Sequence, residues 1–104
     1  MNKYRDKSDF EINKAVAEHV GGFALSLAVT DEPHKPGWNP GIFDPCSNPA
    51  DAMPIIIENG ISSLFNDDEW ICSVPYTEFL SINESLYRAA MEVFLMMKEA
   101  ENEK

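Results

Sequence analysis

The chain has 104 residues and a net charge of −10, from 18 acidic and 8 basic side chains, and 44% of its residues are hydrophobic. This length and composition predict a single globular domain over residues 1–104, with flexible ends at 1–7 and 100–104. The charge disfavours direct binding to nucleic acid, because phosphates are repelled. No apolar run is long enough to span a bilayer and the N-terminus does not resemble a leader. We therefore expect a cytoplasmic protein that does not bind membranes.

The acidic residues are unevenly distributed. No lysine or arginine occurs from Pro36 to Tyr87, a stretch that carries eight carboxylates. The simplest interpretation is that the charge keeps the protein in solution. A basic protein partner, or imitation of the charge of DNA, is the alternative, with Glu58, Asp67–Glu69 and Glu78 lining one side of a hairpin.

The first predicted helix begins after Ser8, which has with Glu11 the S-x-x-E spacing of a capping box. Apolar residues recur at helical spacing up to residue 20, and a pair of glycines at 21 and 22 is expected to end the helix. The next segment, Phe23–Val29, is almost uniformly apolar and predicts a buried strand.

A long segment with four prolines, residues 30–47, then predicts an irregular loop, which its aromatic and aliphatic residues should pack down. The loop leads into a helix predicted over Pro49–Asn59. Asn48 is its expected cap, Gly60 its expected stop, and Pro54 is expected to kink it or break its first turn.

Segments Ile61–Phe65 and Trp70–Val74 flank a polar link and predict a β-hairpin. A last helix is predicted over Asn83–Glu99, with a capping box at Ser81 and Glu84 or a cap at Asn83. Arg88 is expected to pair with Glu84 and Glu92 on its solvent side. Its apolar arc is wider than one sheet face needs. Either the long loop covers the excess, or a homodimer forms through this C-terminal helix.

Together these elements predict an α+β fold in which a three-stranded antiparallel sheet packs with three helices. The expected order is helix, strand, long loop, helix, hairpin and helix. The expected strands are Phe23–Val29, Ile61–Phe65 and Trp70–Val74.

Three segments, SDFEINKAVAEHVG, FDPCSNPADAMPIIIENGIS and SLYRAAMEVFLMMKE, resemble the NinX-like family of small proteins encoded by lambdoid and related phages. A related grouping, the phage ABA sandwich domain, has a similar D-P-x-x-x-x-A-D-A-x-P block. The resemblance implies helices packed against an antiparallel sheet in a phage accessory protein, and it carries over no catalytic residues. The residues that match the block are Asp44, Pro45, Asn48, Ala50, Asp51, Ala52 and Pro54.

The candidate chemistry is sparse. Cys46 precedes a predicted helix start, which could favour its thiolate, and His34 is the one base in the same loop. The alternative is a small apolar residue packed under the loop, and we favour it. His19, His34, Cys46 and Cys72 have no metal-ligand spacing, and no phosphate-binding loop occurs. We therefore expect no cofactor, no metal and no enzymatic activity.

The most plausible function is then an interaction module that binds a host or phage protein in the host cytoplasm. The candidate surface is the loop before the second helix, because aromatic residues dominate interfaces. Its residues are Trp38, Phe43, Asp44, Cys46, Asn48 and Asp51. The second hypothesis is an acidic decoy that occupies a host DNA-binding factor, and a small enzyme that uses Cys46 is the third.

Overall fold

The computed structural model describes residues 2–31 and 42–102, which form three helices and a three-stranded antiparallel sheet. The predicted α+β class is therefore confirmed. The elements are α1 (Asp9–Ser26), α2 (Pro49–Glu58), β1 (Ser62–Asn66), β2 (Glu69–Ser73), β3 (Leu80–Asn83) and α3 (Leu86–Asn102).

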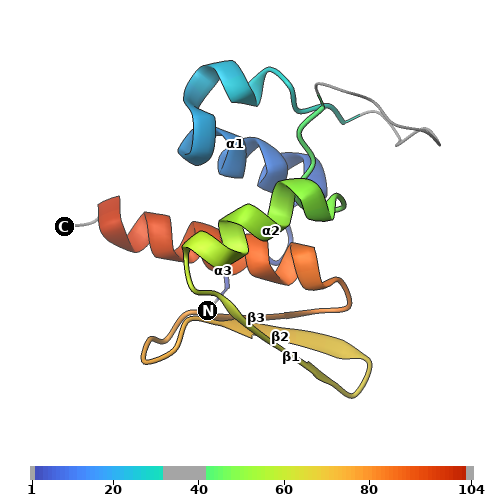
Figure 1. Cartoon of the computed structure of the whole chain (residues 1–104), viewed down its shortest axis with the longest axis vertical. Coiled ribbons are helices and arrows are strands. Elements are labelled where there is room, and N and C mark those ends of the chain that lie inside the picture. The colour runs from blue at the N-terminus through green and yellow to red at the C-terminus, as the bar shows by residue number, and fades with distance from the viewer. Residues whose placement is uncertain (1, 32–41, 103–104) are drawn as a thin grey trace.

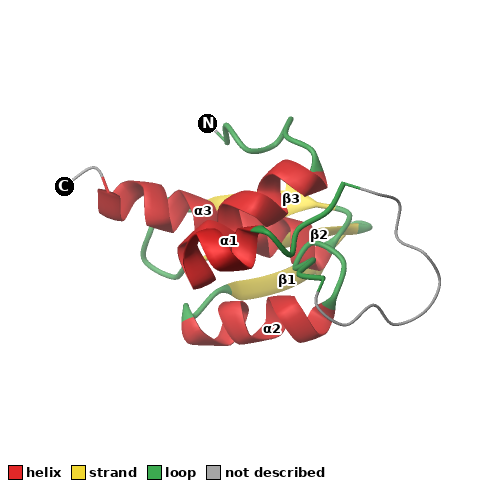
Figure 2. Cartoon of the chain, turned by 90° about the horizontal axis from the view of Figure 1, so that it is seen from above, coloured by secondary structure: helices red, strands yellow, loops and turns green. Residues whose placement is uncertain are grey.

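Helix α3 lies between two layers (Figure 1). One side packs on β2 and β3, and another side contacts α1 and α2. The view from above shows α1 crossing over α3, with α2 beside them (Figure 2). This central position explains why the apolar arc of α3 is so wide. The excess is covered by helices of the same chain, so the width no longer argues for a homodimer.

The start of α1 is as predicted, and its first regular part stops at Gly22. Ser8 and Glu11 form both halves of the capping box. Gly22 has φ 68° and ψ −159°, which interrupts the helix as the glycine pair predicts, and a second helical segment follows the kink. The segment after the kink is helical up to Ser26, so the predicted strand Phe23–Val29 is wrong. A short apolar run suits a strand or a helix equally well, and the backbone bonds here are local, as in Ala28 N–H to Leu25 O.

The sheet is a meander in the order β1-β2-β3. The predicted hairpin is present as β1 and β2, with Leu64 opposite Ile71. The third strand is β3, which pairs with β2 and places Ile82 opposite Ile71. It was missed because LSIN is short and follows an irregular segment.

Helix α3 begins three residues later than predicted. Ser81 lies in β3 and forms no capping box. Instead, Asn83 Oδ1 accepts a hydrogen bond from Ser85 N–H, and Ser85 Oγ accepts one from Arg88 N–H at 3.3 Å. The C-terminal end of α3 extends to Asn102, past the predicted end. Among residues 2–31 and 42–102, no helix is both long and apolar enough to cross a bilayer.

Candidate functional site

The loop before α2 is held by its own polar side chains. Asn48 Oδ1 accepts a hydrogen bond from Ala50 N–H at 3.0 Å, which confirms the predicted cap of α2. Asp51 Oδ2 accepts one from Asp44 N–H at 2.9 Å, and Asp44 O accepts one from Asn48 N–H at 2.8 Å. Through these bonds the three residues organise the turn. Pro49 takes the first helical position, and α2 continues through Pro54 without the predicted first-turn break.

Asn13 of α1 ties this loop to the core. Its side chain is 4% exposed, donates from Nδ2 to Asp44 Oδ1 at 2.7 Å, and accepts from Cys46 N–H at 3.0 Å. Sequence reasoning missed Asn13. The available signal was a polar residue beside Ile12 on the buried stripe of an amphipathic helix, where it needs a partner.

Cys46 is 4% exposed, and its Sγ lies 4.0 Å from the Asp9 carbonyl oxygen. Burial, and secondly the Asp9 carboxylate, raise the pKa of the Cys46 thiol far above its usual range. A thiolate activated by the start of α2 is therefore not favoured, and the packed interpretation is supported. Slow thiol labelling of Cys46 stays a prediction.

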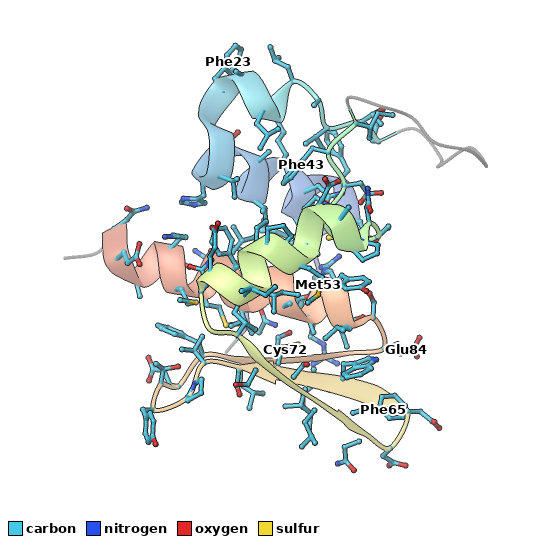
Figure 3. All side chains as sticks on the ribbon, viewed as in Figure 1. Phe23, Phe43, Met53, Phe65, Cys72 and Glu84 are labelled. Atoms are coloured by element: carbon cyan, nitrogen blue, oxygen red, sulfur yellow. The ribbon has the colours of Figure 1, made fainter. Side chains whose placement is uncertain are left out.

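Of the other candidate residues, Phe43 is half-buried against the core, and Figure 3 places it between α1 and α2. Trp38 and His34 lie outside the described residues. In the described part of the loop, the polar candidates Asp44, Asn48 and Asp51 all bond within the chain. Their role in binding a partner stays a prediction.

A buried ion pair lies on α3, where the sequence predicted a solvent side. Arg88 is 8% exposed and Glu92 is 1% exposed, and Arg88 Nε donates to Glu92 Oε2 at 2.6 Å. Glu84–Arg88 is not among the ion pairs of the described residues; Arg88 bonds Asp9 Oδ1 instead. The prediction failed because spacing of four residues identifies a pair but not the face on which it lies.

This pair also holds the N-terminal segment, residues 2–7. The Arg88 guanidinium donates to the carbonyl oxygens of Tyr4 and Lys7, at 2.9 and 2.6 Å. Asn2 Nδ2 donates to Glu92 Oε1 at 2.5 Å, and Ser81 Oγ donates to the same oxygen at 2.7 Å. Every polar group of the pair thus forms a hydrogen bond within the protein, and these bonds hold the N-terminal segment against α3.

Two cavities open near these groups. One of about 600 Å³ is lined by residues of the N-terminal segment, β3 and α3, among them Tyr4, Leu80 and Met96. Another of about 180 Å³ is lined by Asp9, Asp44 and neighbours, and Cys46 is not in its wall. Within the described chain, no three His, Cys, Asp or Glu residues are grouped so as to hold a metal ion.

The face of the sheet opposite α3 carries a row of apolar side chains that no other element covers in the described chain. Cys72 and Ser81 point toward α3 and are buried, and Figure 3 shows Cys72 between the sheet and the helix. The alternate residues Leu64, Ile71 and Ile82 are aligned across all three strands on the other face. We call these three residues the apolar row.

Leu64 is 62% exposed and Ile82 is 49% exposed, and Leu80 beside Ile82 is also exposed. Figure 1 shows no part of the described chain beyond this face. A cross-strand row of exposed aliphatic side chains is typical of a binding surface. Sequence reasoning missed it, because alternation in a hairpin separates two faces without saying which one a helix covers.

Carboxylates lie at both ends of this sheet rather than along one side. Asp67 and Asp68 form the turn between β1 and β2, and Glu78 lies in the connection between β2 and β3, at the opposite end (Figure 1). The predicted ridge of Glu58, Asp67–Glu69 and Glu78 along one side of the hairpin is therefore not formed.

In the comparison with known families, a family model described as Bacteriophage P22, NinX, matches residues 3–98. The comparisons with curated proteins and with solved structures found no match.

Proposed function

Because the chain belongs to the NinX family of bacteriophage proteins, we propose that it is an accessory protein that acts in the host cytoplasm by binding another protein. The observation that carries the proposal is the uncovered apolar row of Leu64, Ile71 and Ile82. Exposed aliphatic side chains cost free energy in water, and a partner that buries them recovers about 25 cal/mol per Å².

The sheet face is better placed for this role than the loop before α2. In the described part of that loop and at the start of α2, Asp44, Asn48 and Asp51 bond within the chain, and Cys46 is buried. The raised pKa and burial of the Cys46 thiol also support a binding function over catalysis by this residue.

The test is capture of partners from infected host cells with the wild-type protein and with Leu64→Ser/Ile82→Ser. Both side chains are exposed, so the fold should be kept, and an unchanged melting temperature checks this. Phe23→Ser/Leu27→Ser is the matched control, because Phe23 and Leu27 are 77% and 70% exposed at the C-terminal end of α1. Figure 3 shows Phe23 there, far from the sheet. A protein captured by the wild type and the control, and lost with the apolar-row variant, supports the proposal. Equal capture by all three contradicts it.

The second candidate function is an acidic decoy for a host DNA-binding factor. It is favoured by the absence of lysine and arginine from Pro36 to Tyr87. The same capture distinguishes the two, because exposed charges are screened by salt and apolar contacts are not. A decoy is indicated if capture disappears by about 0.2 M salt and is the same for the wild type and the apolar-row variant.

A further inference from the structure

Strand β1 is an open edge of the sheet. The strand order is β1-β2-β3, and within residues 2–31 and 42–102 only β2 pairs with β1. All five residues of β1 are exposed. An edge strand presents a row of free main-chain donors and acceptors to which another strand can pair.

The turn geometry identifies these groups. Asp67 and Asp68 have φ of 54° and 66°, the two positive values of a type I′ hairpin turn. In such a hairpin the pair next to the turn, Asn66 and Glu69, is hydrogen-bonded, and the bonded pairs alternate along the strand. The N–H and C=O groups of Ser63 and Phe65 therefore point away from β2, toward the open side.

Strand β1 lacks three features that protect an edge, namely lysine, proline and a bulge. Its sequence, SSLFN, has no lysine and no proline, and its pairing with β2 is continuous, without a bulge. The opposite edge differs, because the N-terminal segment lies beside β3: Asn2 Nδ2 donates to Ser81 Oγ at 3.1 Å, and Asn2 and Tyr4 line one cavity with Leu80. The molecule thus has one edge that is more accessible than the other.

Acidic residues flank β1 along the chain at both ends. Glu58 ends α2, just before β1, and Asp67 and Asp68 directly follow it. A second copy of β1 paired antiparallel would bring its own Asp67–Asp68 turn toward Glu58 of the first copy. The carboxylates of two copies would repel each other, whereas a segment that carries lysine or arginine would be attracted to the Asp67–Asp68 turn and to the net charge of −10.

We propose that β1 is a strand-addition site for an extended segment of a partner protein, in which aliphatic residues alternate along the strand and basic residues flank them. The segment pairs its main chain with Ser63 and Phe65, and its aliphatic side chains continue the apolar row. This inference rests on the proposed function and specifies the mode of binding and the chemistry of the partner.

The probe is a synthetic peptide in which leucine and threonine alternate between pairs of lysines, and its Kd is measured by fluorescence anisotropy at near-physiological salt. Ser63→Pro removes one outward N–H, and proline is tolerated on an edge strand at such a position. Loss of main-chain bonds should weaken peptide binding about tenfold. Ser63→Ala is the matched control, because it changes the side chain and keeps the N–H.

Two further measurements make the result independent of how well Ser63→Pro folds. The peptide N-methylated on alternate residues should bind wild-type protein about tenfold more weakly, because it cannot donate along the edge. Hydrogen exchange at the Ser63 and Phe65 amides should slow when the unmodified peptide is bound. A peptide with glutamates in place of the lysines should not bind.

A different result is peptide binding that is unchanged by Ser63→Pro and by N-methylation but lost with Leu64→Ser/Ile82→Ser. This result means that the peptide docks on the sheet face of the apolar row without adding a strand. It overturns the inference and leaves the proposed function intact. Equal binding of the glutamate peptide, or no binding of the lysine peptide, overturns the assigned chemistry. A wild-type dimer that Ser63→Pro converts to a monomer shows that a second copy occupies the edge, and also overturns the proposal.

Discussion

At the start of α2, the Asn48 side chain satisfies the Ala50 N–H, which has no partner inside the helix. Replacing Asn48 by alanine should therefore lower the free energy of unfolding by about 1 kcal/mol. Urea denaturation measures the change. Ser47→Ala is the control, because Ser47 is an exposed neighbour whose main chain makes the same turn. Equal urea midpoints for Asn48→Ala and the wild type would show that the Asn48 cap does not stabilise the protein.

Arg88 and Glu92 form a buried ion pair. Burial lowers the pKa of Arg88, but its hydrogen bonds to Asp9 and Glu92 outweigh this, so the pKa is raised and the guanidinium stays charged. Arg88→Met leaves the Glu92 carboxylate buried without its counter-charge. We expect a loss of about 3–5 kcal/mol in unfolding free energy.

A double-mutant cycle tests whether this loss comes from the unpaired charge. Arg88→Met/Glu92→Leu removes both charges and should cost less than the sum of the single variants. The exposed pair Lys98–Glu101 is the comparison, and Glu101→Gln should cost no more than about 1 kcal/mol. A buried-pair variant as mild as Glu101→Gln would contradict the assignment.

At the scale of the element, Gly22 determines the path of α1. Its φ of 68° with ψ of −159° falls in a region that only glycine adopts readily, and an added Cβ would meet no atom within 4 Å. The cost of Gly22→Ala is therefore that of the backbone alone, about 1–3 kcal/mol. Thermal unfolding should show it, with Lys14→Ala in the exposed, regular part of α1 as a control near zero. Full stability of Gly22→Ala would mean that the kink is not required.

Local signals in the sequence predicted the beginnings of α1 and α2. A capping side chain and the amide that it binds lie within three residues of each other, as for Ser8 with Glu11 and Asn48 with Ala50. Phe23–Val29 shows the limit of such signals. The choice between strand and helix there depended on whether a sheet strand was available to pair with it, which is not a local property.

The candidate site was harder to predict than the helix starts, because it depends on contacts between residues that are far apart in the sequence. The sequence gives no measure of which face of the hairpin α3 would cover, so the apolar row could not be predicted. Nor could the burial of Arg88, since it requires the N-terminal segment to pack against α3, 81 residues from Lys7 along the chain. The cap at Asn48 could be predicted, because its bond to Ala50 N–H joins residues only two positions apart.

At the scale of the whole molecule, the two cysteines are buried in two different interfaces. Cys46 is buried where the loop before α2 meets α1, and Cys72 is buried where the sheet meets α3. Burial raises the pKa of the Cys72 thiol to about 11, and it raises that of Cys46 still further. Both thiols therefore keep their protons in the folded chain under conditions in which an exposed thiol would ionise.

The unfolding free energy should consequently fall at alkaline pH. In the unfolded chain each thiol loses its proton above about pH 8.5, so above that value the unfolded state binds fewer protons than the folded state. Below this pH the thiols do not change the unfolding free energy, because they are protonated in both the folded and the unfolded chain. Above it, each thiol lowers the unfolding free energy by up to about 1.4 kcal/mol per pH unit, until Cys72 itself ionises near its folded pKa of about 11.

Urea denaturation under reducing conditions, from about pH 7 to about pH 10, measures this slope. Cys46→Ala and Cys72→Ala should each reduce the slope, whatever they do to the stability at neutral pH, and the double variant should reduce it most. A slope that the double variant retains in full would assign the alkaline loss to tyrosine or lysine instead. Up to about pH 10 both thiols keep their protons in the folded chain, so the two single variants should reduce the slope by similar amounts.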